Sequence, residues 1–420
     1  MAQSLDRDEL SSSALSETAE VVLRFGAALT RAGQTAFRVR EWMGVLAHKM
    51  GLGVPAVSIT FNSITASFRR GSESAVLVRE IEPPVINAFR ISALEQLAQT
   101  ASSAPPDIAT KLAEIEATAP AYSPAQIAVA ISAACGGFAF LNGAGILEVI
   151  AAAIAGAVGQ GVRGWLSRRR LTQYGVTALC AVVASTIYSF VAWIPAQFGL
   201  SLEHHTTGLF ASVLFLIPGF PLVAALLDLL QYQAAAAVTR FAHCAMILLA
   251  ATFGLSVVIA AVGLDMTQPP LELEVPLTLF LRAIASFAGG CGFAMLYNSA
   301  PRTVLAVGLL ALGANELRLG LHDAGMRLAP ATFFGSLAVG LLASRMIRTF
   351  KEPRIAITVP GIIVMIPGVY AYQMIVLSNQ GRTLDALQAA ASFGFVVGAM
   401  AMGLAVARFL SQHDSSLRTT

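Results

Sequence analysis

The sequence carries little charge. Only 12% of its 420 residues are Asp, Glu, Lys or Arg, whereas 56% are hydrophobic, and the mean hydropathy is +0.70. A soluble domain of average composition carries about twice that share of charge, ~25%. This scarcity excludes an ordinary soluble protein and predicts a chain that lies mostly in a lipid bilayer.

Lysine and cysteine are also scarce. Only three of the 27 basic residues are Lys, and no basic stripe with interleaved aromatic residues occurs, which argues against nucleic acid as a partner. The four cysteines lie in apolar segments and have no CxxC or other metal-ligand spacing. We therefore expect buried free thiols, no metal site and no cofactor.

The N-terminus lacks the features of a cleavable signal. The segment 1–20 is polar and acidic, without a basic start and an apolar core. Residues 1–124 carry 11 Lys and Arg against 13 Asp and Glu, whereas residues 125–420 carry 16 against 11. The sequence thus predicts a cytoplasmic domain over residues 1–124, followed by a more basic membrane region.

Periodicity predicts an α+β fold for that N-terminal domain. Helical spacing of apolar residues and short β-branched runs alternate with turn residues before a Pro-containing linker at 119–126. The expected helices are 14–30, 34–50, 85–99 and 106–117, and the expected strands are 57–61, 64–68 and 75–81.

Apolar stretches fill the rest of the chain. A bilayer core of about 30 Å needs roughly 17 to 25 residues of helix. We expect an α-helical polytopic membrane protein with about ten spans, in two sets of five over residues 125–263 and 276–410. The expected spans are 125–141, 145–161, 173–194, 206–227, 240–262, 276–297, 302–317, 330–347, 355–377 and 386–409.

Basic residues predict the orientation of these spans. With the N-terminus inside, twelve Lys and Arg fall in cytoplasmic loops or at the C-terminus, and three fall in outer loops. The cytoplasmic set is Arg163, Arg168, Arg169, Arg170, Arg240, Arg302, Arg345, Arg348, Lys351, Arg354, Arg408 and Arg418, and the outer set is Arg318, Arg327 and Arg382. The outer loop 264–275 has three acidic residues and no basic one. Both termini are therefore expected in the cytoplasm.

Two short sequences recur in the same order. Cys135–Asn142 (CGGFAFLN) is echoed by Cys291–Asn298 (CGFAMLYN), and Phe215–Gly219 (FLIPG) by Val364–Gly368 (VMIPG). Repeats with an odd number of spans must have opposite orientations, so five-span repeats predict the inverted plan of many secondary transporters. Chance similarity between alanine-rich helices is the alternative.

The Pro-Gly pairs indicate where a ligand would bind. Proline removes a backbone donor, so Pro218-Gly219 and Pro367-Gly368 should interrupt their helices near mid-membrane, where only protein or water can satisfy the freed backbone. Packing kinks without a ligand are the alternative. The candidate substrate-binding residues are Asn142, Pro218, Gly219, Asn298, Pro367, Gly368, Tyr370 and Gln373.

Two acids within the apolar region are candidates for proton coupling. Glu148 lies near the start of the second expected span, and Asp228 lies ten residues beyond Pro218. An ionisable group at the centre of a membrane helix costs at least about 2.5 kcal/mol, so each acid there suggests a role. A position at the membrane interface is the alternative for both.

Several of these segments resemble the threonine/serine exporter (ThrE-like) family. They are Leu29–Glu41 (LTRAGQTAFRVRE), Ile217–Asp228 (IPGFPLVAALLD), Thr358–Gly361 (TVPG) and Ile366–Gly368 (IPG). The resemblance covers nearly the whole chain, and some relatives split its two halves between two chains. The second half departs from the pattern because no acid follows Pro367 as Asp228 follows Pro218.

The resemblance implies export of small hydrophilic metabolites, threonine and serine first, across a bacterial inner membrane by the proton motive force. C4 dicarboxylates such as succinate are the alternative cargo. A channel, or a sensor with a regulatory N-terminal domain, is an alternative from another class. A membrane enzyme is disfavoured because the N-terminal domain has no nucleophile-base spacing, phosphate loop or metal cluster. The coupling ion, the role of that domain and the oligomeric state, including a homo-oligomer, stay open.

Overall fold

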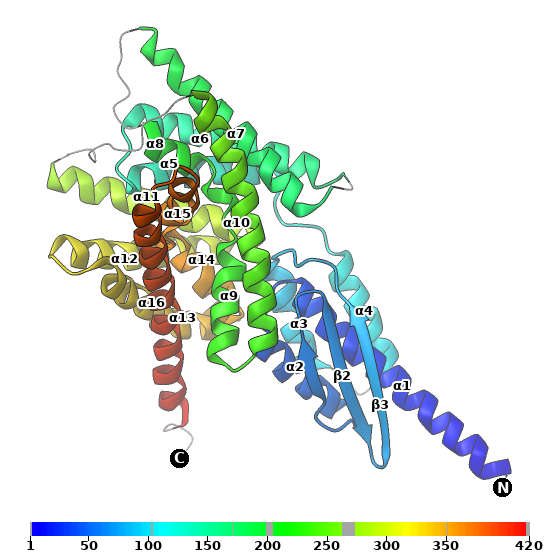
Figure 1. Cartoon of the computed structure of the whole chain (residues 1–420). Coiled ribbons are helices and arrows are strands. Elements are labelled where there is room, and N and C mark those ends of the chain that lie inside the picture. The colour runs from blue at the N-terminus through cyan, green and yellow to red at the C-terminus, as the bar shows by residue number, and fades with distance from the viewer. Residues whose placement is uncertain are drawn as a thin grey trace. The chain divides into compact units, whose positions relative to one another are not determined.

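A computed structural model describes residues 2–101, 104–169, 171–198, 205–262, 274–350 and 352–416 (Figure 1). Contacts divide the chain into two units. The N-terminal unit comprises residues up to Pro120, the segment Ala224–Ala242 and a short stretch around Pro353, and the helical unit comprises the rest. Arg170, Lys351, Arg418 and most of the loop 264–275, all used to predict orientation, lie outside the described residues.

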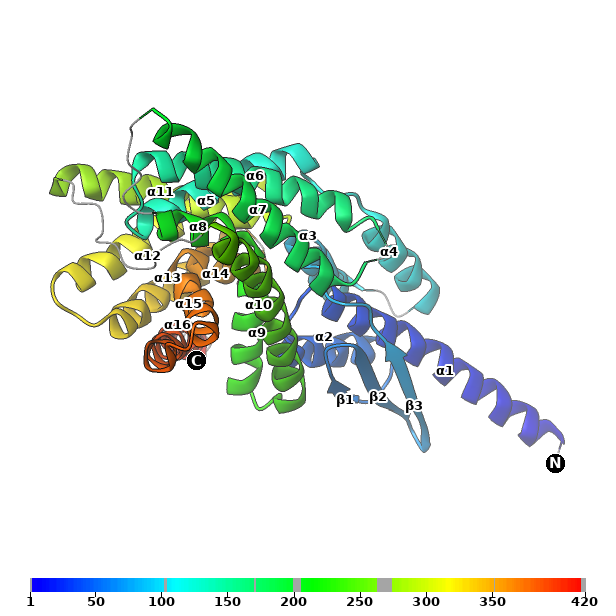
Figure 2. The same cartoon turned by 45° about the horizontal axis from the view of Figure 1, so that its top comes forward.

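The N-terminal unit contains the predicted α+β elements. They are α1 (Ala2–Arg31), α2 (Ala36–Lys49), β1 (Ala56–Ile59), β2 (Ser63–Arg70), β3 (Glu73–Glu80), α3 (Ala88–Thr100) and α4 (Pro105–Ala117). The strands form an antiparallel sheet in the order β1-β2-β3, seen side by side in Figure 2. The predicted small sheet is therefore confirmed.

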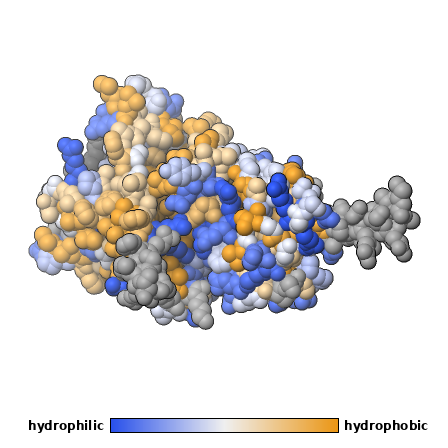
Figure 3. Space-filling view, turned by 90° about the horizontal axis from the view of Figure 1, so that it is seen from below, coloured by the Kyte–Doolittle hydropathy of each residue, from blue (hydrophilic) through white to orange (hydrophobic). Residues whose placement is uncertain are grey.

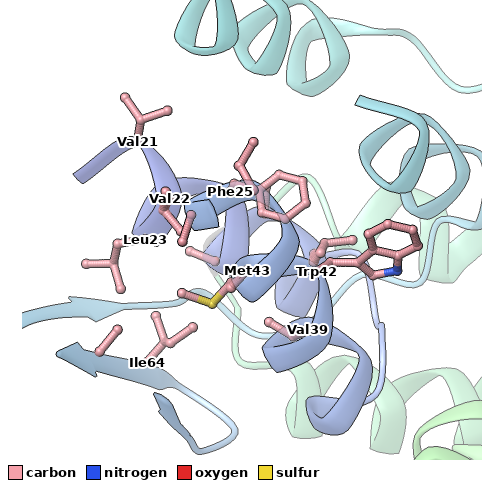
Figure 4. Packing of buried hydrophobic residues seen from close by; sticks show 14 of the residues in the cluster. Val21, Val22, Leu23, Phe25, Val39, Trp42, Met43 and Ile64 are labelled. Carbon is pink, nitrogen blue, oxygen red and sulfur yellow. The ribbon is translucent and has the colours of Figure 1, made fainter. Parts of the chain in front are cut away.

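Helices cover one face of this sheet. Ile64, Ala66 and Phe68 alternate along β2 and are buried, whereas Val76 and Val78 of β3 are each 66% exposed. Met43 of α2 lies between α1 and the strand that carries Ile64 (Figure 4). Because side chains alternate across a strand, only one face joins the core.

The helical unit is built from long apolar helices. They are α5 (Pro124–Leu141), α6 (Ile146–Leu166), α7 (Gln173–Ala196), α8 (His205–Ser212), α9 (Gly219–Leu230), α10 (Ala234–Val262), α11 (Val275–Leu296), α12 (Pro301–Asp323), α13 (Leu328–Phe350), α14 (Arg354–Ile362), α15 (Gly368–Asn379) and α16 (Thr383–Ser416). The unit boundaries fall inside α9 and α10. On the face seen in Figure 3, hydrophobic residues gather over the helical unit, whereas hydrophilic residues and smaller hydrophobic patches mix over the N-terminal unit.

The structure accounts for eight or nine of the about ten expected spans. Within the described ranges, eight helices are long and apolar enough to cross a bilayer, or nine if the bent pair α14 and α15 is one span. The two expected spans that hold the Pro-Gly motifs are both broken, 206–227 into α8, a 3₁₀ turn and α9, and 355–377 into α14, a 3₁₀ turn and α15. The 12 residues of α9 reach about 18 Å, so the first of these spans crosses a bilayer core only if α8 and α9 act together.

The elements recur in the same order in both halves. Helices α5, α6, α7, the broken α8–α9 and α10 correspond to α11, α12, α13, the broken α14–α15 and α16. The broken parts align in one register without insertion or deletion. Leu214–Leu216 corresponds to Ile363–Met365, and α9 to α15.

The packing of α1 in the N-terminal unit yields a first prediction. A methyl group on Gly26 would overlap the sulfur of Met43 and lie 3.1 Å from Cδ1 of Ile64. Since overpacking typically costs about 1–3 kcal/mol, we expect G26V to lower the free energy of unfolding by that amount. Urea unfolding of the full chain, followed by Trp42 fluorescence in a W165F/W193F background, measures it.

Gly44 provides the matched control, since a methyl group there would meet only Cγ1 of Val54 at 3.9 Å. G44V, which adds the same side chain at an open position of α2, should not lower the free energy of unfolding as G26V does. Equal losses in G26V and G44V would contradict the close packing of α1 on α2.

Candidate functional site

Both broken helices have the same local geometry. A 3₁₀ turn, Leu214–Leu216 in the first half and Ile363–Met365 in the second, is followed by an extended residue before proline. Ile217 has φ −64° and ψ 128°, and Ile366 has φ −62° and ψ 124°. A residue before proline is pushed from the helical to the extended region, so the sequence itself breaks each helix. The predicted interruptions are confirmed.

Side chains from other helices bond to the backbone of the first interruption. The Tyr372 hydroxyl donates to the Val213 carbonyl at 2.8 Å, which also accepts from the Leu216 N–H at 3.0 Å, and Nη1 of Arg163 donates to the Phe215 carbonyl at 3.4 Å. Tyr372 is fully buried and comes from α15, in the other half of the chain. Irregular backbone in an apolar region needs such partners.

The two interruptions pack against each other in a reciprocal way. A methyl group on Gly219 would lie 2.6 Å from Cδ1 of Ile366, and one on Gly368 would overlap Cδ1 of Ile217. Gly219 and Gly368 are equivalent positions, as are Ile217 and Ile366. Each glycine therefore receives the isoleucine of the other half, and the close approach requires the absence of a side chain.

The space between the interruptions is closed. The cavity there has a volume of about 10 Å³ and is lined by Phe138, Leu214, Ile217, Gly219, Phe293, Ile363 and Ile366. A single water needs about 10–15 Å³ of such space and two to four polar partners. This conformation therefore has no room for a ligand between the Pro-Gly motifs.

The two repeated asparagines are far apart. Gly137 of α5 approaches Ala285 of α11, and Gly292 of α11 approaches Ala130 of α5, so the two helices run antiparallel. Asn142 follows α5 and Asn298 follows α11, so they lie at opposite ends of the pair, about 27 Å apart at 1.5 Å per residue.

Each asparagine makes local bonds at its own end of the helix pair. The Asn142 amide donates to the Phe138 carbonyl at 2.7 Å, whereas Oδ1 of Asn298 accepts from the Ala121 backbone N–H at 2.8 Å. The structure therefore does not bring the two residues into one site.

Tyr370 and Gln373 line a second, polar cavity of about 280 Å³ between α15 and α16. The other lining residues are Leu377, Arg382, Asp385, Gln388, Ala389 and Ser392. Of the eight predicted substrate residues, Pro218, Gly219, Pro367 and Gly368 lie at the two interruptions, Tyr370 and Gln373 line this open cavity, and Asn142 and Asn298 lie at opposite ends of the α5–α11 pair.

Glu148 is buried within the helical unit. It lies in the first turn of α6, is 1% exposed, and its Oε2 accepts from the Gly145 backbone N–H at 2.9 Å. The Tyr188 hydroxyl of α7 donates to its Oε1 at 3.5 Å. An acid at a helix N-terminus is stabilised by the helix dipole, and Glu148 caps α6 in this way.

Asp228 lies in the N-terminal unit and is fully buried. Its Oδ1 accepts from the Phe37 backbone N–H at 3.3 Å, and its Oδ2 lies 3.7 Å from Nε of Arg240. The residue before α2, Thr35, makes no capping bond with its own side chain. Asp228 therefore caps α2 from 191 residues further along the chain.

Arg240 also binds the backbone that leads into α2. Its Nη2 donates to the Gln34 carbonyl at 2.6 Å, and Nε2 of Gln34 donates to Oε1 of the buried Glu95 at 2.7 Å. From the sequence, Arg240 is expected only in a cytoplasmic loop. Its acceptor on Gln34 is remote in the sequence, and no local pattern signals it.

These features define a polytopic helical membrane protein with two equivalent interrupted helices in contact. One family model, described as "Putative threonine/serine exporter", matches residues 20–262, and a second, "Threonine/Serine exporter, ThrE", matches residues 282–410. The chain belongs to the threonine/serine exporter family and carries both of its domains, which confirms the resemblance.

Part of the chain is similar to another protein. An "Uncharacterized protein" of Haemophilus influenzae (strain ATCC 51907 / DSM 11121 / KW20 / Rd) is 34% identical over 124 residues. That match covers 27% of this chain and 41% of the relative, so the chain spans less than half of that protein's length. No solved structure matches the chain.

The buried Asp228–Arg240 pair yields a second prediction. D228A would leave the guanidinium of Arg240 buried without its carboxylate and would remove the cap of α2. Breaking a buried pair on one side costs about 3–5 kcal/mol, so we expect the free energy of unfolding to fall by that amount. Trp42 fluorescence during urea unfolding measures it.

The exposed pair of Glu20 with Arg79 in the same unit is the matched control, since such pairs contribute about 1 kcal/mol or less. A loss in D228A no larger than the loss in E20A would rule out the capping role.

Proposed function

We propose that this protein exports threonine and serine from a bacterial cytoplasm, driven by the proton motive force. The observation that carries this proposal is the reciprocal contact of the two interrupted helices. Discontinuous helices at equivalent positions of two repeats are typical of transport sites. Membership of the threonine/serine exporter family supports the choice of substrate.

We propose that the two halves form an inverted repeat. Antiparallel packing of the equivalent helices α5 and α11, and the shared order of five elements, support this arrangement. In such a protein the halves rock about a central site and open it to either side in turn. The closed cavity between the Pro-Gly motifs fits an occluded state of that cycle.

We propose that both termini lie in the cytoplasm. The segment Ala224–Ala242 and the stretch around Pro353 pack with the N-terminal unit, so these three parts share one side. They include Arg240 and Arg354, two of the basic residues that the positive-inside rule assigns to the cytoplasm.

We propose Glu148 as the acid that couples protons to transport. It is buried among membrane helices beside Tyr188, where a proton can be exchanged as the site opens and closes. Asp228, the other candidate, lies in the N-terminal unit and forms the buried ion pair with Arg240. Its role in coupling stays a prediction.

Transport itself is the first test. The purified chain in proteoliposomes should exchange radiolabelled threonine for internal threonine or serine, with saturation, and an imposed proton gradient should drive net uptake or release. Exchange of succinate alone would favour the dicarboxylate alternative. Non-saturable flux would favour a channel, and no flux of any of these with folded protein would contradict the proposal.

The close approach of the interruptions yields a third prediction. G219V and G368V would force Ile366 or Ile217 out of place, and we expect threonine exchange to fall about ten-fold or more because the closed state cannot form. G313V is the control, since a methyl group on Gly313 meets nothing within 4 Å. Exchange by G219V and G368V equal to that of G313V would contradict this role.

The coupling acid yields a fourth prediction. E148Q keeps an acceptor for the Gly145 N–H but cannot release a proton. We expect threonine exchange at equilibrium to persist while acceleration by an imposed pH gradient is lost. D228N is measured in parallel, and a pH response that is lost in D228N but kept in E148Q would move the coupling role to Asp228.

A further inference from the structure

The polar cavity between α15 and α16 is distinct from the closed space between the Pro-Gly motifs. Arg382 directly precedes α16, and Asp385 lies in its first turn. Nε and Nη2 of Arg382 both lie 2.8 Å from Oδ2 of Asp385. The two side chains are 44% and 48% exposed, so an accessible cation and anion stand side by side in the cavity.

The equivalent hairpin of the first half, α9–α10, binds protein groups on the face that corresponds to this cavity. In the register that aligns α9 with α15, Asp228, Gln233, Thr239 and Arg240 correspond to Leu377, Arg382, Gln388 and Ala389. All four residues of the first set contact residues of the α1–β2 region of the N-terminal unit, to which their own segment Ala224–Ala242 belongs. Besides Asp228 and Arg240, Oε1 of Gln233 accepts from Arg40 at 3.4 Å, and Oγ1 of Thr239 accepts from the Phe61 N–H at 3.1 Å.

The second hairpin therefore presents the same face without an occupant among the described residues. All four of the corresponding positions line the cavity of about 280 Å³. In the first half, a carboxylate and a guanidinium on this face hold a backbone N–H and a backbone carbonyl. In the second half, the positions equivalent to Asp228 and Arg240 are Leu377 and Ala389, and the charged pair is instead Arg382 and Asp385, which are exposed to solvent.

We propose that this cavity binds a free amino acid as a zwitterion. The Nε/Nη2 edge of the Arg382 guanidinium faces Asp385, so the α-carboxylate lies on the other edge, where Nη1 and Nη2 can hold it through two parallel N–H bonds. The α-ammonium lies on the carboxylate of Asp385. Tyr370, Gln373, Gln388 and Ser392 supply neutral hydrogen-bonding groups for a side-chain hydroxyl.

Size and charge restrict the ligand. The cavity is near the lower end of ligand sites, which range over about 300–1,000 Å³, so it suits a small metabolite rather than a nucleotide or peptide. A C4 dicarboxylate would place one carboxylate on Arg382 and bring the other toward Asp385. Like charges repel, so the cavity selects threonine or serine over succinate.

This inference rests on the proposed export function and adds a location to it. In the proposed topology, the α15–α16 hairpin opens to the outer side. The cavity is then the last site that the amino acid occupies before release.

Binding of radiolabelled L-threonine to the purified full chain tests the site. We expect R382Q and D385N each to weaken threonine binding about ten-fold or more, since each removes a charge-assisted bond. R282Q is the matched control, because Arg282 forms an ion pair with Asp323 outside the cavity. Parent-like affinity in both R382Q and D385N would overturn the proposal.

Ligand analogues test the same site without any substitution. L-serine should compete with threonine on the parent protein, whereas succinate, threonine methyl ester and N-acetylthreonine should compete poorly, because each lacks one of the two charges. The methyl ester should lose less affinity, relative to threonine, in R382Q than in the parent protein. Equal competition by the ester, the N-acetyl compound and threonine would overturn the proposal.

The proteoliposome measurement separates the two levels of inference. Threonine export with binding unaffected by R382Q and D385N would reject the cavity but leave the exporter in place. Neither binding nor transport of threonine by folded protein would reject both. Loss of threonine binding confined to R382Q and D385N, with R282Q unchanged, supports both.

Discussion

The need to satisfy backbone groups in an apolar environment governs the centre of the helical unit. Pro218 and Pro367 each break a helix, and the chain cannot leave the freed carbonyls without partners. Arg163 and Tyr372 donate to the carbonyls of Phe215 and Val213. The two broken helices also pack against each other through Gly219 and Gly368. Side-chain packing, rather than solvent, therefore fills the space between the two Pro-Gly motifs.

A second polar arrangement lies in the N-terminal unit. Asp228 and Arg240 stand on either side of the α9–α10 turn, and both hold the backbone that connects α1 to α2. Helix α9 begins in the helical unit at Gly219 and ends within the N-terminal unit. One short helix therefore carries both the glycine of the first interruption and the acid that caps α2.

The sequence predicted the features that depend on local chemistry. Alternation and helical spacing located the sheet and helices of the N-terminal unit, and proline located both breaks. The expected span count exceeds the eight or nine candidate spans of the structure because α8 and α9, on either side of the break at Pro218, are each too short to cross a bilayer alone. Asn142 and Asn298 share a motif, but the antiparallel packing of α5 on α11 separates them. Arg163 and Arg240 were missed as partners because their acceptors are backbone carbonyls distant in sequence.

The reciprocal packing of the interruptions has a consequence for how the chain can be divided. An isoleucine from the other half packs against each glycine, and the Tyr372 hydroxyl of the second half donates a hydrogen bond to the backbone of the first. Each interruption therefore packs against a side chain of the other half. A gene split between α10 and α11 would yield two polypeptides that each leave this packing surface uncovered until they assemble.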